Sequence, residues 1–123
     1  MQAINALELA KQAAAILDEK KGDAIVILDV REISTVTDYY VLVTGNSPPH
    51  LKALSNELAY QLKAAGEKKF RRAGAPEGGW LVLDYMDVII HILSEEARAY
   101  YDLEGLWAAA PKVPRRRRTQ PRP

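Results

Sequence analysis

The sequence predicts an α/β fold, in the form of an α+β mixed sheet with helices packed on it. Two observations support this prediction. Segments with apolar residues at helical spacing alternate along the chain with short runs rich in β-branched and aromatic residues. The expected order is helix, strand, strand, helix, short edge strand, strand, strand and helix. Residues 1–110 are predicted to form a single domain, because a body of that size buries roughly two-thirds of its chain surface.

The first four elements follow from apolar spacing and from residues typical of helix ends. Residues 2–21 carry an apolar stripe at helical spacing, with glycine immediately beyond. Residues 24–30 (AIVILDV) are an almost unbroken apolar run, which indicates a central strand with both faces covered. Residues 39–44 are predicted to be the second strand. The next helix is expected to begin at Ser47, an N-cap residue followed by proline, and to end at Gly66.

The later elements follow from charge, glycine and hairpin patterns. A basic segment around Phe70 is expected to form an edge strand before a glycine-rich loop. Residues 80–85 and 88–93 are predicted to form a tight hairpin, although the two residues between them lack the glycine that such turns favour. The last helix is expected to start at Ser94, with two glutamates in its first turn, and to break at Gly105.

The charge of the chain is unevenly distributed. It has 17 basic and 16 acidic residues and a net charge of +1, but residues 111–123 contain six of the basic residues and no acid. The body therefore carries a charge of about −5 and the tail about +6. The tail is rich in proline and arginine, so it is expected to bury no apolar surface and to be disordered when free.

Composition excludes several classes of protein. The chain has no cysteine, which excludes a disulfide framework, a thiolate metal site and a cysteine nucleophile. Its apolar runs are strand-sized, far short of the roughly 20 residues that a membrane-spanning helix needs, and it opens on an Ala, Leu and Glu pattern rather than a signal peptide. We therefore expect a soluble cytoplasmic protein.

The polar residues predict no catalytic residue, metal site or cofactor. Residues 45–47 (GNS) lie between a strand and a helix, where backbone N–H groups bind phosphate, but they lack the glycines and lysine of a phosphate-binding loop, which favours helix capping. Asp84 and Asp87 lie across a turn and do not form the paired carboxylates of a two-metal site. His50 and His91 have no second ligand at metal spacing.

Alternation along the first hairpin strand places an apolar strip on one of its faces. That face carries Trp80, Val82, Asp84 and Met86, whereas Tyr85 lies on the other face with two leucines. In one interpretation, another element of the domain covers the strip. In the other, the strip stays partly exposed and a tryptophan with aliphatic neighbours forms a protein-binding hot spot.

Six short strings occur in an order that is specific to one protein family. They are Asp29 in LDV, residues 37–40 (TDYY), 45–47 (GNS), 80–84 (WLVLD), 87–91 (DVIIH) and 96–107 (EARAYYDLEGLW). These strings closely resemble the ribosomal silencing factor family, also called Iojap-like, over about residues 7–107. The resemblance implies a fold that looks like a nucleotidyltransferase without the catalytic carboxylates. Two departures are Met86, where the family often has glycine, and the arginine-rich tail, which extends beyond the family's usual ending.

The resemblance implies a translational repressor rather than an enzyme. Family members bind the large ribosomal subunit through its fourteenth large-subunit protein, block association with the small subunit and lower translation when nutrients are short. An acidic body suits a basic ribosomal protein. The partner-binding residues that the resemblance implies are Trp80, Val82, Asp84, Tyr85 and Met86. The residues to which it gives a supporting role are His91, Arg98, Tyr101, Glu104 and Trp107.

Two alternatives stay open at this point. A nucleotidyltransferase-like enzyme rests on residues 45–47 and on analogy of fold. An RNA-binding module would act through the tail, where arginines release counterions from ribosomal RNA phosphates. The arginines concerned are Arg115, Arg116, Arg117 and Arg118. The sequence also leaves the oligomeric state open, including a homodimer of the free protein.

Overall fold

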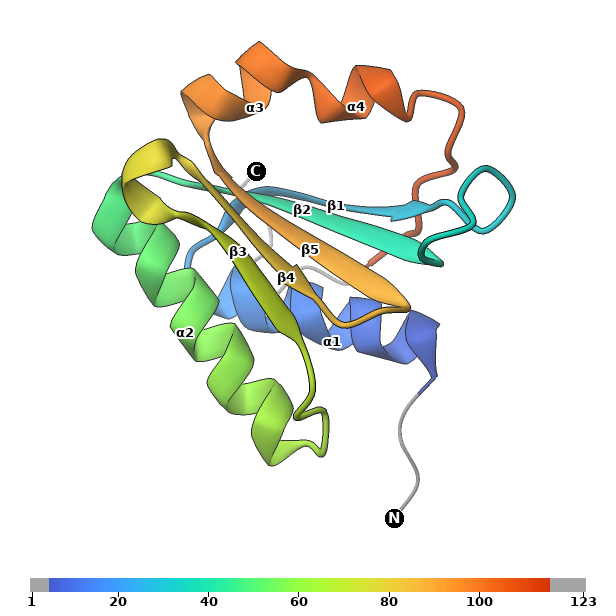
Figure 1. Ribbon diagram of the computed structural model, residues 1–123, viewed down its shortest axis with the longest axis horizontal. Helices are drawn as coiled ribbons and strands as arrows, with labels where there is room; N and C mark the ends of the chain where they lie inside the picture. Colours follow the sequence, from blue (N-terminus) through green and yellow to red (C-terminus); the bar gives the residue numbers. More distant parts are fainter. Residues whose placement is uncertain (1–4, 116–123) are drawn as a thin grey trace, which may run out of the picture.

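A computed structural model describes residues 5–115, which form a five-stranded mixed sheet with helices on both faces (Figure 1). In chain order the elements are α1 (Ala6–Glu19), β1 (Asp23–Asp29), β2 (Tyr39–Gly45), α2 (Pro48–Ala64), β3 (Arg71–Ala75), the 3-10 turn η1 (Pro76–Gly78), β4 (Trp80–Asp84), β5 (Val88–Ser94), α3 (Glu95–Tyr101) and α4 (Leu103–Leu106). The mixed α/β class and the order of elements predicted from the sequence are confirmed.

The strands lie in the order β1-β2-β5-β4-β3. The central pair, β2 and β5, is parallel, and every other neighbouring pair is antiparallel. The prediction that residues 24–30 form a central strand is therefore wrong, because β1 lies at an edge of the sheet. Its side chains are apolar because helices or the C-terminal segment cover both of its faces, and burial of two faces does not by itself place a strand in the middle.

The C-terminal segment covers the free edge of β1. Asp29 N–H donates to the Pro111 carbonyl and Val113 N–H donates to the Ile27 carbonyl, both at 2.8 Å. Val113 also packs against the main core. The expectation that the tail buries no apolar surface from residue 111 onward is therefore wrong for residues 111–115, which dock on the body. Residues 116–123, where the rest of that prediction falls, lie outside the described residues.

Two cores of unequal size lie on opposite faces of the sheet (Figure 1). The larger core holds the apolar stripes of α1 and α2 against inward-facing residues of four strands, including Leu81, Leu83 and Tyr85 of the hairpin. The smaller one lies under α3 and α4 and includes Leu42 and Leu93. Because α3 and α4 are short, they cover only part of their face.

The start of α2 agrees with the capping prediction, whereas the break in the last helix lies at a different residue from the predicted one. The Ser47 hydroxyl accepts a hydrogen bond from His50 N–H, so the capping interpretation of residues 45–47 is confirmed. The last helix breaks at Asp102 rather than at Gly105. Asp102 has a left-handed backbone (φ 48°), and its carboxylate caps α4 by accepting from Gly105 N–H at 3.1 Å.

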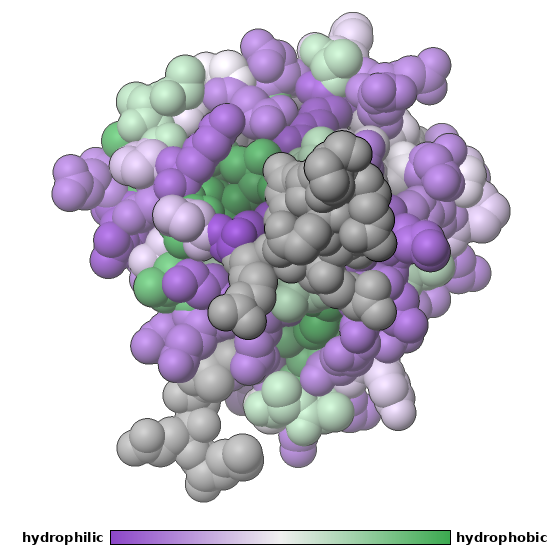
Figure 2. Space-filling model, turned by 180° about the vertical axis from the view of Figure 1, so that it is seen from behind, coloured by the Kyte–Doolittle hydropathy of each residue, from purple (hydrophilic) through white to green (hydrophobic). Residues whose placement is uncertain are grey.

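Seen from behind, the surface is mostly polar, with apolar residues confined to smaller areas between charged side chains (Figure 2). Among residues 5–115, no helix has both the length and the apolar character to cross a membrane.

Candidate functional site

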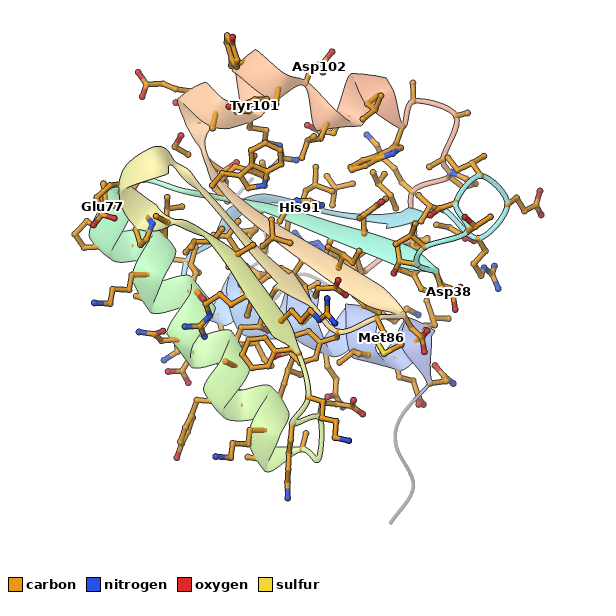
Figure 3. The ribbon with its side chains drawn as sticks, in the orientation of Figure 1. Asp38, Glu77, Met86, His91, Tyr101 and Asp102 are labelled. Atoms are coloured by element: carbon orange, nitrogen blue, oxygen red, sulfur yellow. The ribbon has the colours of Figure 1, made fainter. Side chains whose placement is uncertain are left out.

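An aromatic cluster fastens α3 and α4 to the sheet and covers Trp80. The Trp80 ring lies 4.5 Å from that of Tyr101, and the Tyr40 and Trp107 rings stack with centroids 3.9 Å apart. His91 lies between these two pairs, on the strand below Tyr101 (Figure 3). Tyr101 therefore covers part of the Trp80 ring, as the first interpretation of the apolar strip expects, but Trp80 and Val82 both stay half-buried, as the second expects.

His91 is buried and its hydrogen bonding fixes its tautomer. The Trp80 indole N–H donates to His91 Nδ1 at 3.1 Å. Since an indole nitrogen only donates, Nδ1 carries no proton and Nε2 does. Nε2 is buried without a partner among the described residues. Burial lowers the pKa of His91 to about 4, so the ring is neutral at physiological pH and holds the tryptophan in place.

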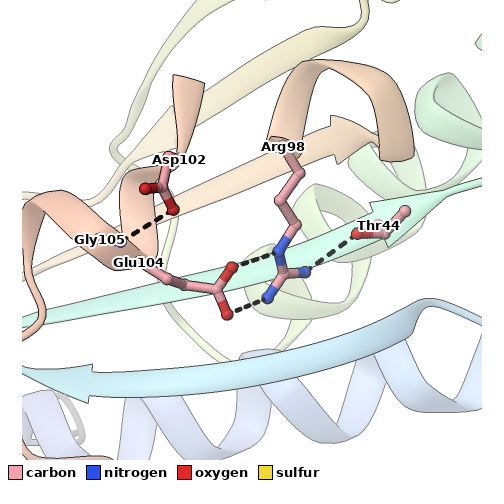
Figure 4. Close-up of polar contacts among 5 residues, drawn as sticks. All are labelled: Thr44, Arg98, Asp102, Glu104 and Gly105. Atoms are coloured by element: carbon pink, nitrogen blue, oxygen red, sulfur yellow. Dashed lines mark hydrogen bonds and ion pairs between the residues drawn. The ribbon is translucent and has the colours of Figure 1, made fainter. Parts of the chain in front are cut away.

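Arg98 joins α3, α4 and the sheet (Figure 4). Its Nε and one terminal nitrogen donate to the two Glu104 carboxylate oxygens, each at 2.9 Å, and its other terminal nitrogen donates to the Thr44 hydroxyl at 3.0 Å. The bidentate guanidinium lowers the pKa of Glu104. These contacts attach α3 and α4 to β2, and the supporting role that the resemblance implies for Arg98 and Glu104 stays a prediction.

The hairpin turn places a large apolar side chain in solvent. Met86 has φ 75° and is 77% exposed. The residues on either side of Met86 are joined by a hydrogen bond in which Asp87 N–H donates to the Tyr85 carbonyl at 3.0 Å. The Asp84 carboxylate accepts from Met86 N–H at 2.8 Å. Met86 lies at the tip of the hairpin, at the opposite end of the sheet from Glu77 (Figure 3).

Tyr85 is a correction to the predicted contact residues. Its side chain is 6% exposed and belongs to the core under α1 and α2, where its ring stacks on Phe70 with centroids 4.9 Å apart. Burial raises its pKa to about 12. A partner on the Trp80 face of the hairpin cannot reach this ring, because strand alternation turns it to the other side.

A groove of about 460 Å³ lies beside the uncovered part of the hairpin. Its lining residues are Val36, Lys69, Phe70, Arg71, Asp84 and Met86. Val82 lies on the same face of β4 as Asp84, and Arg71 is paired with Asp84 across the two strands. We call Val36, Arg71, Val82, Asp84 and Met86 the hairpin surface. It combines two strongly exposed apolar side chains, Val36 and Met86, with charges of both signs.

The hollow beside residues 45–47 does not suit a phosphate. It has a volume of about 770 Å³ and is lined by Ser47 and by the carboxylates of Glu77, Glu95 and Glu96. Three acids oppose an anion at close range. Residues 5–115 hold no group of three histidines or acids placed to bind a metal ion.

Sequence reasoning placed Asp84 and Met86 in the site but missed Val36 and Arg71. Both are brought to the hairpin by chain segments outside it, namely the loop between β1 and β2 and the edge strand β3. The basic pattern around Phe70 predicts an edge strand, but no local pattern indicates that Arg71 lies beside Asp84. Arg115 also differs from expectation, because it bonds to the Asp18 carboxylate and the Ile25 carbonyl.

These features define a small mixed-sheet domain that presents a partly uncovered sheet face rather than an enclosed pocket. A protein-family model described as "Ribosomal silencing factor during starvation" matches residues 3–123, and the chain belongs to this family. The match runs to residue 123, so the tail does not lie beyond the family as the sequence suggested.

Relatives and a solved structure agree with this assignment. The chain is 35% identical over 108 residues to Ribosomal silencing factor RsfS of Bacillus subtilis, covering 88% of this chain and 92% of that protein. It is 39% identical over 92 residues to the Haemophilus influenzae protein of the same name, covering 75% and 90%. A crystal structure of a Chromobacterium violaceum protein superposes with a TM-score of 0.81 at 32% identity, covering 85% of this chain and 88% of that one.

Proposed function

We propose that this protein represses translation by binding the large ribosomal subunit, through its fourteenth large-subunit protein, and blocking association with the small subunit. The main support for this proposal is that the chain belongs to the family described as "Ribosomal silencing factor during starvation". Repression would operate in the cytoplasm under nutrient limitation. No covalent step is needed, because a protein bound tightly on the intersubunit face excludes the other subunit by occupancy.

The hairpin surface is the proposed contact. Val36 and Met86 are 71% and 77% exposed and line the same groove, so their apolar surface is available to a partner. Asp84 and Arg71 flank them and would fix the register of a partner. A net charge of about −5 on residues 1–110 favours a basic ribosomal protein and mainly raises the association rate.

Trp80 acts in this proposal by holding the surface in place. It is clamped between Tyr101 and His91, and its N–H is already bonded, so it has little freedom to donate to a partner. Truncating it would loosen the attachment of α3 and α4 as well as any contact, so it is a poor probe of binding alone.

The proposal is tested by adding the protein to separated ribosomal subunits and following their reassociation by light scattering. The diagnostic variant is Val82→Lys, which places a charge in the middle of the hairpin surface. The control is Tyr60→Lys on α2, which is 72% exposed and lies outside that surface. If Val82 is a hot spot, its variant binds subunits roughly 30-fold more weakly, corresponding to about 2 kcal/mol, while the control is unchanged.

Two results would contradict the proposal. Unchanged subunit joining at saturating wild-type protein would remove the blocking mechanism. Equal loss in the Val82 and Tyr60 variants would remove the hairpin surface as the contact. Sedimentation of the free protein in the same buffer tests the separate prediction of a homodimer.

A further inference from the structure

A second groove runs between α2 and the edge strand β3. Its volume is about 290 Å³, and its lining includes Lys52, Ser55 and Asn56 from α2 and Arg72 from β3. Glu77 contributes one carboxylate to the same lining. The groove lies outside the hairpin surface, because β3 turns Arg71 and Arg72 to opposite faces of the sheet.

Ser55 is the unusual member of this groove. It is 2% exposed, and its hydroxyl has no hydrogen-bond partner among the described residues. A buried hydroxyl without a partner is destabilising relative to one that is bonded. A ligand atom that accepts from Ser55 Oγ would recover that loss, whereas an alanine at this position would avoid it without any ligand.

The cations around the groove are not neutralised within the body. Lys52 and Arg72, which line the groove, are exposed and form no ion pair with residues 5–115. Arg72 belongs to the segment 67–72, which carries a net charge of +3, although Lys69 and Arg71 of that segment lie on the side of the hairpin groove. This is a concentrated positive edge on a body whose total charge is about −5.

We propose that the groove between α2 and β3 binds the phosphate backbone of RNA. Lys52 and the planar Arg72 guanidinium supply the charge, and the Asn56 amide and the Ser55 hydroxyl donate hydrogen bonds. An acidic protein fits less well, because a narrow groove with a buried hydroxyl donor suits a compact phosphate oxygen better than a flexible carboxylate side chain. The proposal rests on the proposed function in one respect, since ribosomal RNA is the RNA that a subunit-bound protein meets.

Salt dependence of RNA binding tests this assignment with the full-length protein. The probe is a fluorescently labelled single-stranded oligouridylate, followed by anisotropy at several salt concentrations. Lys52→Gln with Arg72→Gln removes two phosphate contacts, so the slope of log K against log salt falls by about 1.4, at roughly 0.7 per contact for a single strand. The control pair is Lys11→Gln on α1 with Lys20→Gln at its C-cap, which changes the net charge equally and should leave the slope unchanged.

Ser55→Ala separates a specific contact from general electrostatics. The RNA affinity is expected to fall about tenfold with no change in salt slope, while the midpoint of thermal unfolding stays equal or rises. An unchanged RNA affinity for Ser55→Ala would overturn the proposal. Equal salt slopes for the groove pair (Lys52→Gln with Arg72→Gln) and the control pair would also overturn it. The same Ser55 dependence for a polyglutamate peptide would assign the groove to an acidic protein instead. Circular dichroism confirms that each variant is folded.

Binding to isolated large subunits distinguishes this proposal from the proposed function. Loss of joining inhibition with intact oligouridylate binding would contradict the proposed function alone. Intact inhibition with no oligouridylate binding would contradict the groove assignment alone. A chain ending at residue 115 keeps the docked segment and tests the separate prediction of RNA contact through Arg116, Arg117 and Arg118.

Discussion

Replacing Met86 with glycine is expected to stabilise the fold and weaken partner binding at the same time. Met86 holds φ 75°, a left-handed backbone conformation that costs a residue with a Cβ atom about 1–2 kcal/mol. Glycine avoids that cost but adds roughly 0.5–1 kcal/mol of conformational entropy to the unfolded chain. The side chain is 77% exposed, so its removal sacrifices little buried surface.

The balance favours Met86→Gly by about 0.5–1 kcal/mol, which corresponds to a rise of roughly 2–4 °C in the unfolding midpoint of a domain of this size. Met86→Ala is the matched control. It removes the same apolar contact but keeps the Cβ atom, so it relieves no backbone strain. Both variants should lose the same affinity for the large subunit, because both lack the exposed side chain.

Thermal and urea unfolding, followed by circular dichroism, measure the first half of this prediction, and subunit binding measures the second. If Met86→Gly is no more stable than Met86→Ala, the turn is not strained and the reasoning from its backbone is wrong. If both variants bind as tightly as the wild type, Met86 makes no contact with the partner.

Three further predictions concern the elements that hold the site. Burial lowers the pKa of His91 to about 4, so between pH 6.5 and 4 the unfolded chain binds a proton that the folded chain does not. The free energy of unfolding should therefore fall by up to about 3 kcal/mol as the pH drops through this range. Unfolding measured at several pH values should show a smaller decrease for His91→Asn. Arg98→Lys loses the fork that holds Glu104 and should cost about 1–2 kcal/mol in urea unfolding, with hydrogen exchange in α3 and α4 increased. Val113→Asp puts a charge against the core and should lower the unfolding midpoint, whereas an exposed control, Val36→Asp, should not.

Much of the fold could be predicted because its signals are local. Helical spacing, strand-length apolar runs and Ser47 and Ser94 as caps each describe a few consecutive residues, and all of them are confirmed. Strand pairing is not local. Residues 24–30 have the composition of a central strand, but their partner on one side is a segment more than 80 positions later, which no local pattern reveals.

Gly105 shows how a correct signal led to a wrong interpretation. Glycine was expected there as a helix break, but a Cβ atom at this position would collide with the Asp102 carboxylate. The glycine makes room for the cap, and the break itself lies at the capping residue. Prediction of the candidate site was limited for a similar reason. Strand alternation assigned the side chains of the hairpin to the correct faces. The contact of Tyr101 with Trp80 and the placement of Val36 beside Met86 depend on tertiary packing, which alternation does not reveal.

The pairing of residues 111–113 with the edge of β1 can form only late in synthesis. Because β1 is made early and residues 111–113 emerge after every other element, a growing chain carries an unpaired, apolar strand edge until this segment has left the ribosome. The sheet is therefore completed only when translation has passed residue 113. A product shortened before residue 111 would leave the backbone groups of this edge unpaired, and we expect it to associate with strands of other chains more readily than the full-length protein does.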